Sequence, residues 1–148
     1  MKSDPLITYR RTPAHLDRSV PESFAETLRL RVARGRLFHC LVTGDAELRS
    51  LNCTWRKQDR PTDVLSFPGS GPGNGDYLGD IAISLARARA QAREWGHSVE
   101  DDIRILMLHG LLHLKGMDHD SDSGEMARAE LRWRRKLGLP SGLIERAG

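Results

Sequence analysis

Three histidines lie close together near the end of a long apolar segment, at His109, His113 and His119. Residues four apart share one face of a helix, so His109 and His113 can offer ring nitrogens to a common point. Gly116 can adopt the left-handed conformation that ends a helix, and the returning chain would bring His119 to that point. Imidazole suits zinc, and three protein ligands leave a fourth position for water, as in catalytic zinc sites. The spacing therefore predicts one zinc ion per chain, with a bound water that ionises at about neutral pH and becomes a nucleophile.

The alternative is that these are three separate histidines, each satisfied by its own neighbours on a packed helix. Three of the six histidines of the chain fall within eleven positions on an otherwise apolar segment. A buried polar group that lacks a partner costs about 1–3 kcal/mol there, which favours a shared ligand over three separate arrangements. The remaining histidines stand alone and receive no role: His15, His39 and His97.

Position 110 distinguishes between classes of zinc hydrolase. Zinc peptidases of the H-E-x-x-H type carry a glutamate directly after the first histidine, where it acts as general base. This chain has Gly110 there, although the spacing H-x-x-x-H-x-x-G-x-x-H is complete. The metal geometry is therefore retained without the peptidase base, which indicates a different substrate or a different base.

The histidines must be positioned by the helix that precedes them. Ser98 and Asp101 form a start that resembles a capping box, and the acids Glu100, Asp101 and Asp102 suit the positive end of the helix dipole. The segment that follows has almost no polar face, so we expect a central buried helix. Its apolar residues are Ile103, Ile105, Leu106, Met107, Leu108, Leu111, Leu112 and Leu114.

The other elements follow from hydrophobic periodicity and from helix breakers. We expect strands at 6–10, 37–43, 63–67 and 77–83. We expect a helix at 21–34, a second that Asp45 caps and that ends before Pro61, and a third from Ser84 to Gly96. A last helix, which Asp122 and Glu125 can cap, is expected to end at Gly138. The strand at 63–67 lies between prolines, which places it at a sheet edge with 77–83 as neighbour. The chain is expected to form a single α+β domain over 1–148.

Two kinds of side chain and one loop have plain structural interpretations. Trp55, Trp95 and Trp133 are expected in the core, and Cys40 and Cys53 are expected as small buried thiols. The glycine-rich segment 69–76 is expected to be mobile, either as a flap over a site or as a simple flexible connection.

The composition is that of an ordinary globular protein of 148 residues with a formal net charge of +3. It shows neither a signal-like apolar start nor a run long enough for a membrane span, so we expect a cytoplasmic protein. A basic cluster near the end suits a polyanionic partner but is equally consistent with a solvated helix. Its members are Arg128, Arg132, Arg134, Arg135, Lys136 and Arg146.

Two segments of the chain resemble the YbeY-type rRNA maturation factors, a family of metal-dependent, single-strand-specific endoribonucleases. They read LNCTWRKQDRPTDVLSFP at 51–68 and HGLLHLKGMDH at 109–119, and LGDI at 78–81 between them is also similar. The resemblance spans about 48–120. Trp55 and Met117 stand where the family more often has tyrosine, and neither change removes a metal ligand.

The resemblance implies a mixed sheet, a central ligand-bearing helix and a zincin-like cleft that Arg56 faces. An arginine there can hold a phosphate with its planar fork, although arginine at a helix end is also common on ordinary surfaces. The implied substrate is single-stranded RNA, namely rRNA of the small ribosomal subunit, in rRNA maturation and ribosome quality control. Two alternatives remain: a zinc peptidase that pairs its substrate with the edge strand 63–67, and a non-catalytic ribosome-assembly factor braced by the metal.

Overall fold

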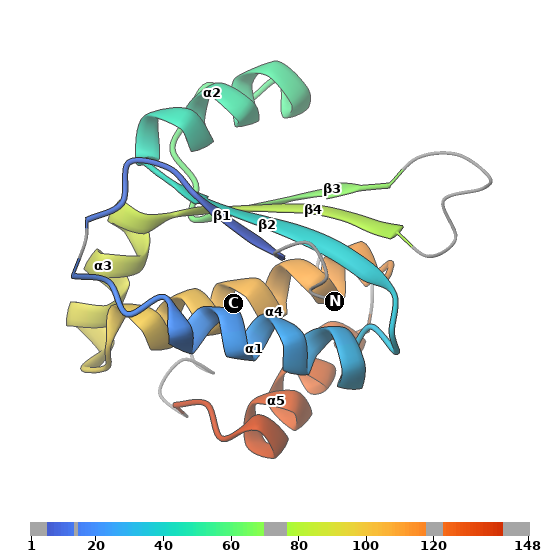
Figure 1. The fold of residues 1–148 in the computed structure, drawn as a ribbon. Helices are drawn as coiled ribbons and strands as arrows, with labels where there is room; N and C mark the ends of the chain where they lie inside the picture. The colour runs from blue at the N-terminus through green and yellow to red at the C-terminus, as the bar shows by residue number, and fades with distance from the viewer. Residues whose placement is uncertain (1–5, 14, 70–76, 118–122, 141–148) are drawn as a thin grey trace, which may run out of the picture.

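The apolar helix with two of the histidines is the central element of the molecule (Figure 1). In the computed structural model, which describes residues 6–13, 15–69, 77–117 and 123–140, this helix is α4 (Val99–Leu114). It starts as predicted, because the Ser98 side chain accepts a hydrogen bond from the Asp101 backbone N–H at 3.0 Å. Gly116 follows its end with a φ of +92°, which confirms the predicted left-handed conformation at this residue. The central position of α4 is confirmed.

Four strands of the described chain form one mixed sheet in the order β1-β2-β4-β3. β1, β2 and β4 run parallel, and β3 pairs antiparallel with β4 from the edge of the sheet. The predicted edge position of β3 and its pairing with the following strand are therefore confirmed. The strand bounds are Ile7–Tyr9 (β1), Leu37–Thr43 (β2), Val64–Pro68 (β3) and Tyr77–Ser84 (β4).

The helices cover the two faces of the sheet unequally (Figure 1). α4 packs against β3 and β4 on one face, with α1 and α5 packed beneath it, whereas α2 packs on the opposite face. Besides α4, the helices of the described chain are α1 (Ser19–Arg31), α2 (Asp45–Arg56), α3 (Leu85–Trp95) and α5 (Glu125–Leu137). An α+β fold with a mixed sheet is thus confirmed.

The alternation of side chains along the strands divides the core into two parts. Phe38, Cys40 and Val42 of β2 point toward α1 and α4 and belong to the main core. On the other face a small second core joins Leu48 of α2 to Leu65 and Ala82. Burial of each of the larger apolar side chains among these, Phe38, Val42, Leu48 and Leu65, stabilises the folded state by about 1.5–3 kcal/mol.

His97, which received no role from the sequence, forms a buried pair at the start of α4. Its Nε2 lies 2.9 Å from Oδ1 of Asp102, and the two side chains are almost fully buried. Because a buried carboxylate requires such partners, this contact ties the connection between α3 and α4 to the first turn of α4.

Two expectations for α2 are wrong. Trp55 is 67% exposed, and Cys53 is also exposed, whereas Cys40 is buried as predicted. The reason is that α2 packs on the sheet through Leu48 and partly through Leu51. The next turn of the helix, which carries Cys53 and Trp55, extends beyond this contact into solvent. Trp95 and Trp133 do pack against the main core.

The predicted N-cap of α2 is wrong as well. Gly44 occupies the cap position, and no side-chain cap bond forms. The Asp45 carboxylate instead accepts hydrogen bonds from Ser84 Oγ at 3.0 Å and from Arg87 Nε at 3.2 Å, so it links α2 to the start of α3.

α5 also begins without a side-chain cap bond. Gly124 occupies its N-cap position, so Glu125 is not the cap that the sequence predicts. The carboxylate of Glu125 accepts from the backbone N–H of Ser123 at 2.6 Å. The other predicted cap, Asp122, and residues 70–76 of the glycine-rich segment lie outside the described residues. None of the described helices is long and apolar enough to cross a membrane.

Candidate metal centre

His109 and His113 lie one turn apart on α4 and bring their ring nitrogens together. Their Nε2 atoms are 3.2 Å apart, and their ring centroids are 4.8 Å apart with the planes steeply inclined. Both side chains are partly buried, so they remain accessible from one side. The geometry is the one that spacing of four on a helix predicts.

The separation of the two Nε2 atoms fits a shared zinc ion. With Zn–N distances of about 2.0–2.1 Å and tetrahedral angles, two ligand nitrogens lie about 3.3 Å apart. The residues present therefore fit zinc by spacing and by donor type.

A buried carboxylate orients the first of these histidines. The Nδ1–H of His109 donates to Oε1 of Glu130 on α5, and Oε2 of Glu130 accepts from Arg134 Nη2 at 2.7 Å. Glu130 is only 2% exposed. Because Nδ1 of His109 then carries the proton, its Nε2 presents a lone pair, as carboxylate–histidine–zinc arrangements require.

Glu130 is the site residue that the sequence reasoning missed. It shares the inward face of α5 with Met126, Ala129 and Trp133, so a carboxylate on an apolar stripe was the available signal. Its partner lies 21 positions away, and no local pattern pairs the two.

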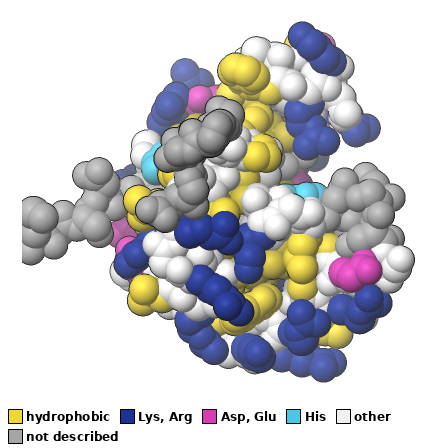
Figure 2. Space-filling model, turned by 90° about the vertical axis from the view of Figure 1, so that its right-hand side faces the viewer, with side chains coloured by type: hydrophobic (Ala, Val, Ile, Leu, Met, Phe, Trp, Pro, Cys, Tyr) yellow, Lys and Arg dark blue, Asp and Glu magenta, His cyan; other side chains and the backbone are white. Residues whose placement is uncertain are grey.

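The two histidines open into a cleft beneath α2. A cavity of about 160 Å³ is lined by Arg56, Val64, Ser66, Pro68, His109 and His113. Figure 2 shows a hollow below α2 with a histidine side chain in its wall. Arg56, from the last turn of α2, thus shares one cavity with two of the three predicted ligands.

The third predicted ligand, His119, lies outside the described residues. Within the parts of the chain that the structure describes, no three His, Cys, Asp or Glu side chains are grouped so that they could hold a metal ion. His109 and His113 with their converging Nε2 atoms are therefore the described part of the candidate centre.

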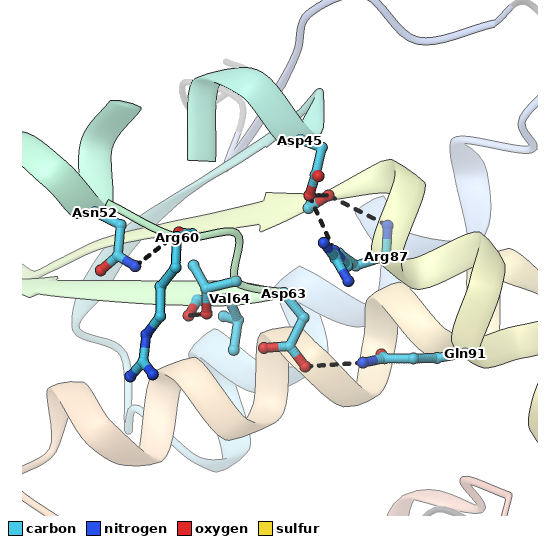
Figure 3. Close-up of polar contacts among 9 residues, drawn as sticks. Asp45, Asn52, Arg60, Asp63, Val64, Arg87 and Gln91 are labelled. Atoms are coloured by element: carbon cyan, nitrogen blue, oxygen red, sulfur yellow. Dashed lines mark hydrogen bonds and ion pairs between the residues drawn. The ribbon is translucent and has the colours of Figure 1, made fainter. Parts of the chain in front are cut away.

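The loop between α2 and β3 is held in place by hydrogen bonds from both sides (Figure 3). Asn52 Nδ2 donates to the backbone oxygen of Arg60 at 3.1 Å, and Gln91 Nε2 of α3 donates to Oδ2 of Asp63, also at 3.1 Å. Lys57 adopts a left-handed conformation at the end of α2. Asn52 and Asp63 thus support the loop that joins Arg56 to β3.

Gly110 lets α4 approach the sheet directly beside the histidines. A Cβ at this position would lie 2.8 Å from Cγ2 of Ile81 and 3.2 Å from Oγ of Ser66. Ser66 also donates its hydroxyl hydrogen to the Gly110 carbonyl at 3.0 Å. The glutamate of a peptidase motif would therefore not fit between α4 and the sheet at position 110.

Positive charge gathers just beyond the end of α4. Lys115 donates from Nζ to the Val32 carbonyl at 2.9 Å. Burial lowers the pKa of its ammonium group, and the nearby guanidinium groups of Arg36 and Arg34 lower that pKa further. Lys115, Arg34 and Arg36 therefore bring positive charge together at this end of the molecule.

The sequence is similar to those of known proteins over most of its length. Residues 11–138 match the family model described as "Endoribonuclease YbeY". A relative of that name from Solibacter usitatus is 62% identical over 140 residues, covering 95% of this chain and 92% of the relative. Another, from Sulfurovum sp., is 37% identical and covers 91% and 92%.

A solved structure shares the fold. The solution structure of TM1509 from Thermotoga maritima has a TM-score of 0.61 and 28% identity, and the match covers 88% of each chain. The family model and the relatives together span most of the chain, including α4, β3 and the last turn of α2. The chain belongs to the YbeY endoribonuclease family, whose members are hydrolases that act on RNA.

Proposed function

We propose that this protein is a zinc-dependent endoribonuclease that cleaves single-stranded RNA during rRNA maturation and ribosome quality control. One zinc ion would be held by His109, His113 and His119 within a single hydrolase domain. The observation that carries the proposal is the approach of two Nε2 atoms to 3.2 Å in a cavity that Arg56 also lines. The rRNA of the small ribosomal subunit is the proposed substrate, and such a substrate would place the protein in the cytoplasm.

The described residues have distinct parts in this proposal. Glu130 accepts the Nδ1 proton of His109 and keeps Nε2 of that ring available as a ligand. Arg56 holds the phosphate with two parallel N–H donors and stabilises the negative charge that develops on its oxygens. Zinc, when bound, would supply Lewis acidity and would activate water at neutral pH.

The proposal is tested with purified protein by elemental analysis and by cleavage of one RNA sequence offered single-stranded and as a duplex. We expect close to one zinc per chain and cleavage of the single strand only. His113→Ala should lose zinc and cleavage, whereas His15→Ala, a change at an exposed histidine, should keep both.

Each alternative predicts a different outcome. A wild-type protein that holds zinc but leaves single-stranded RNA intact would indicate a metal that only braces the fold. Zinc-dependent hydrolysis of unfolded protein without RNA cleavage would indicate a peptidase. Full zinc occupancy in His113→Ala would remove that residue from the centre.

A further inference from the structure

Beyond its first turn, the exposed face of α5 carries four positively charged side chains. Arg128, Arg132, Arg135 and Lys136 are all exposed. Within the described chain none of these four side chains forms an ion pair, and the contact of Arg128 is with the Ser123 carbonyl. Of the two acidic residues of the helix, Glu130 is buried, and Glu125 is exposed in the first turn, where its carboxylate accepts from the Ser123 backbone N–H and forms no ion pair with these four side chains within the described chain.

Ordinary solvation of a helix explains this pattern poorly. Solvated helices gain stability from opposite charges four apart, and like charges at that spacing cost about 0.2–0.5 kcal/mol. Arg128 with Arg132 and Arg132 with Lys136 are such like-charge pairs. The helix dipole favours cations in the last turn, which accounts for Arg135 and Lys136 but not for Arg128 near the positive end.

A groove continues this face toward α1. Its volume is about 470 Å³, and it is lined by Arg31 of α1 and Lys136 of α5, and by Arg104 of α4, which is ion-paired with Asp101. Hydroxyl groups line its α1 wall, and no acidic side chain is among the described lining residues: Ser19, Val20, Ser23, Phe24, Thr27, Arg31, Arg104, Lys136 and Leu137. Cations and hydroxyls are the side chains that contact phosphates and sugars in nucleic-acid complexes.

Two of the groove-lining cations, Arg31 and Lys136, lie over the ring of Trp133. The guanidinium of Arg31 lies 6.0 Å from the centre of this ring, and the ammonium of Lys136 lies 5.2 Å from it. Figure 2 shows lysine and arginine side chains gathered over the lower half of this side of the molecule, where α1 and α5 lie.

The same helix connects this surface to the candidate centre. Glu130 faces His109 from the inner side of α5, whereas the arginines lie on its outer side. Arg128 and Arg135 are seven residues apart, which is about 10 Å along a helix axis. At a spacing of about 3.4 Å per phosphate in a stacked strand, this length matches roughly three phosphates.

We propose that the basic face of α5, formed by Arg128, Arg132, Arg135 and Lys136 and continued by Arg31, binds the phosphate backbone of the RNA substrate outside the cleft. This inference rests on the proposed function only in taking RNA as the substrate. It assigns to α5 a contribution to affinity for long RNA that is separate from cleavage.

The test compares the double variant Arg132→Gln/Arg135→Gln with the matched variant Arg89→Gln/Arg93→Gln on α3. The probe is a single-stranded 2′-O-methyl RNA of about 20 nucleotides, and affinity is followed by fluorescence anisotropy across a salt series. The α5 variant should bind roughly tenfold more weakly, and its log–log salt slope should be shallower by about 1.4, or about 0.7 per lost contact. The loss should shrink as the probe is shortened to about four nucleotides.

The α3 variant should bind like the wild type. Equal losses in the two variants, or no loss in the α5 variant, would overturn the proposal. Loss of binding to phosphatidylserine vesicles with unchanged RNA affinity would overturn it too and would indicate a membrane surface. Because these measurements require no catalysis, a wild type that fails to cleave RNA would contradict the proposed function and leave the binding comparison decisive for α5.

Discussion

Because Nδ1 of His109 carries the proton, the other ring nitrogen, Nε2, has a lone pair that can bind a metal. Glu130 accepts this proton and leaves the Nε2 lone pair pointing toward Nε2 of His113. The carboxylate is itself paired with Arg134 in a nearly fully buried environment. A single acidic side chain thus links the orientation of a candidate ligand to the stability of α5.

Exchange of Glu130 should change both zinc affinity and stability. Glu130→Gln should lower zinc affinity by about 10- to 100-fold, because a neutral amide oxygen is a weaker acceptor for the Nδ1–H of His109 than a carboxylate oxygen. It should also cost about 3–5 kcal/mol of unfolding free energy, because Arg134 loses its buried counterion. Chelator competition and urea unfolding measure the two quantities.

Arg134→Gln is the matched control for this experiment. It should lose similar stability while retaining most of the zinc affinity, since the carboxylate still faces His109. Equal zinc affinity in the wild type and Glu130→Gln would show that Glu130 does not support the ligand.

Arg56 lies in the cleft at an exposed helix end, so its removal should affect chemistry more than folding. Arg56→Ala should leave zinc content and melting temperature nearly unchanged while RNA cleavage falls sharply. Arg56→Lys should restore little, because an ammonium lacks the two-pronged geometry that matches phosphate oxygens. The salt slope of RNA binding should become shallower by about 0.7.

Cleavage assays on wild type, Arg56→Ala and Arg56→Lys check this, with Lys57→Ala as a control at the neighbouring exposed position. Equal activity in the wild type and both Arg56 variants would remove Arg56 from the mechanism.

At the scale of elements, the close approach of α4 to the sheet places the histidines beside β3. Gly110 permits this approach, and the hydrogen bond from Ser66 to the Gly110 carbonyl joins the edge strand to the helix. A proline-flanked strand supplies one wall of the cleft because its other edge carries no neighbouring strand within the described chain.

Gly110→Ala tests this contact. Alanine favours helix by about 1 kcal/mol over glycine, but the new Cβ would meet Ile81 at 2.8 Å. We expect a net loss of about 1–3 kcal/mol from overpacking, together with weaker zinc binding as α4 moves outward. Urea unfolding and zinc titration measure the two effects.

Gly44→Ala is the control, because nothing lies within 4 Å of a Cβ there, and it should cost under about 1 kcal/mol. A more stable Gly110→Ala protein with normal zinc binding would show that the approach of α4 is not tight.

At the scale of the whole molecule, the candidate centre and its cleft join parts that are distant in sequence. The histidines come from α4, the carboxylate that contacts His109 comes from α5, and the cleft walls come from β3 and the end of α2. A metal bound there would stabilise the folded chain by mass action, because the unfolded chain does not bring these elements together.

Removal of zinc should therefore lower the melting temperature at neutral pH. At a free zinc concentration roughly 100 times the dissociation constant, the stabilisation is about 2.7 kcal/mol, or roughly 5–10 °C for a chain of this size. The increment should be complete above about pH 7 and should fade below about pH 6.5, because protons then compete with the metal for imidazole. Calorimetry with and without chelator checks this.

In His113→Ala, chelator should have little effect at any pH. A wild-type melting temperature that chelator leaves unchanged at neutral pH would show that the centre does not support the fold.

The features that the sequence alone determined are those governed by neighbours along the chain. Spacing of four on a helix was sufficient to predict that His109 and His113 converge, the prolines predicted the edge strand, and the side chain of Ser98 predicted the start of α4. Helical and strand periodicity act over a few residues, so such patterns can be read locally.

Only the tertiary structure decided which distant side chains meet. It brought Glu130 to His109 and placed Arg56 in the same cavity as both histidines, and it left Trp55 in solvent where the helical pattern predicted core. It also showed that position 110 lacks room for a side chain. These outcomes depend on how helices and sheet pack against one another, and packing is a property of the whole core that residue spacing within one element does not contain.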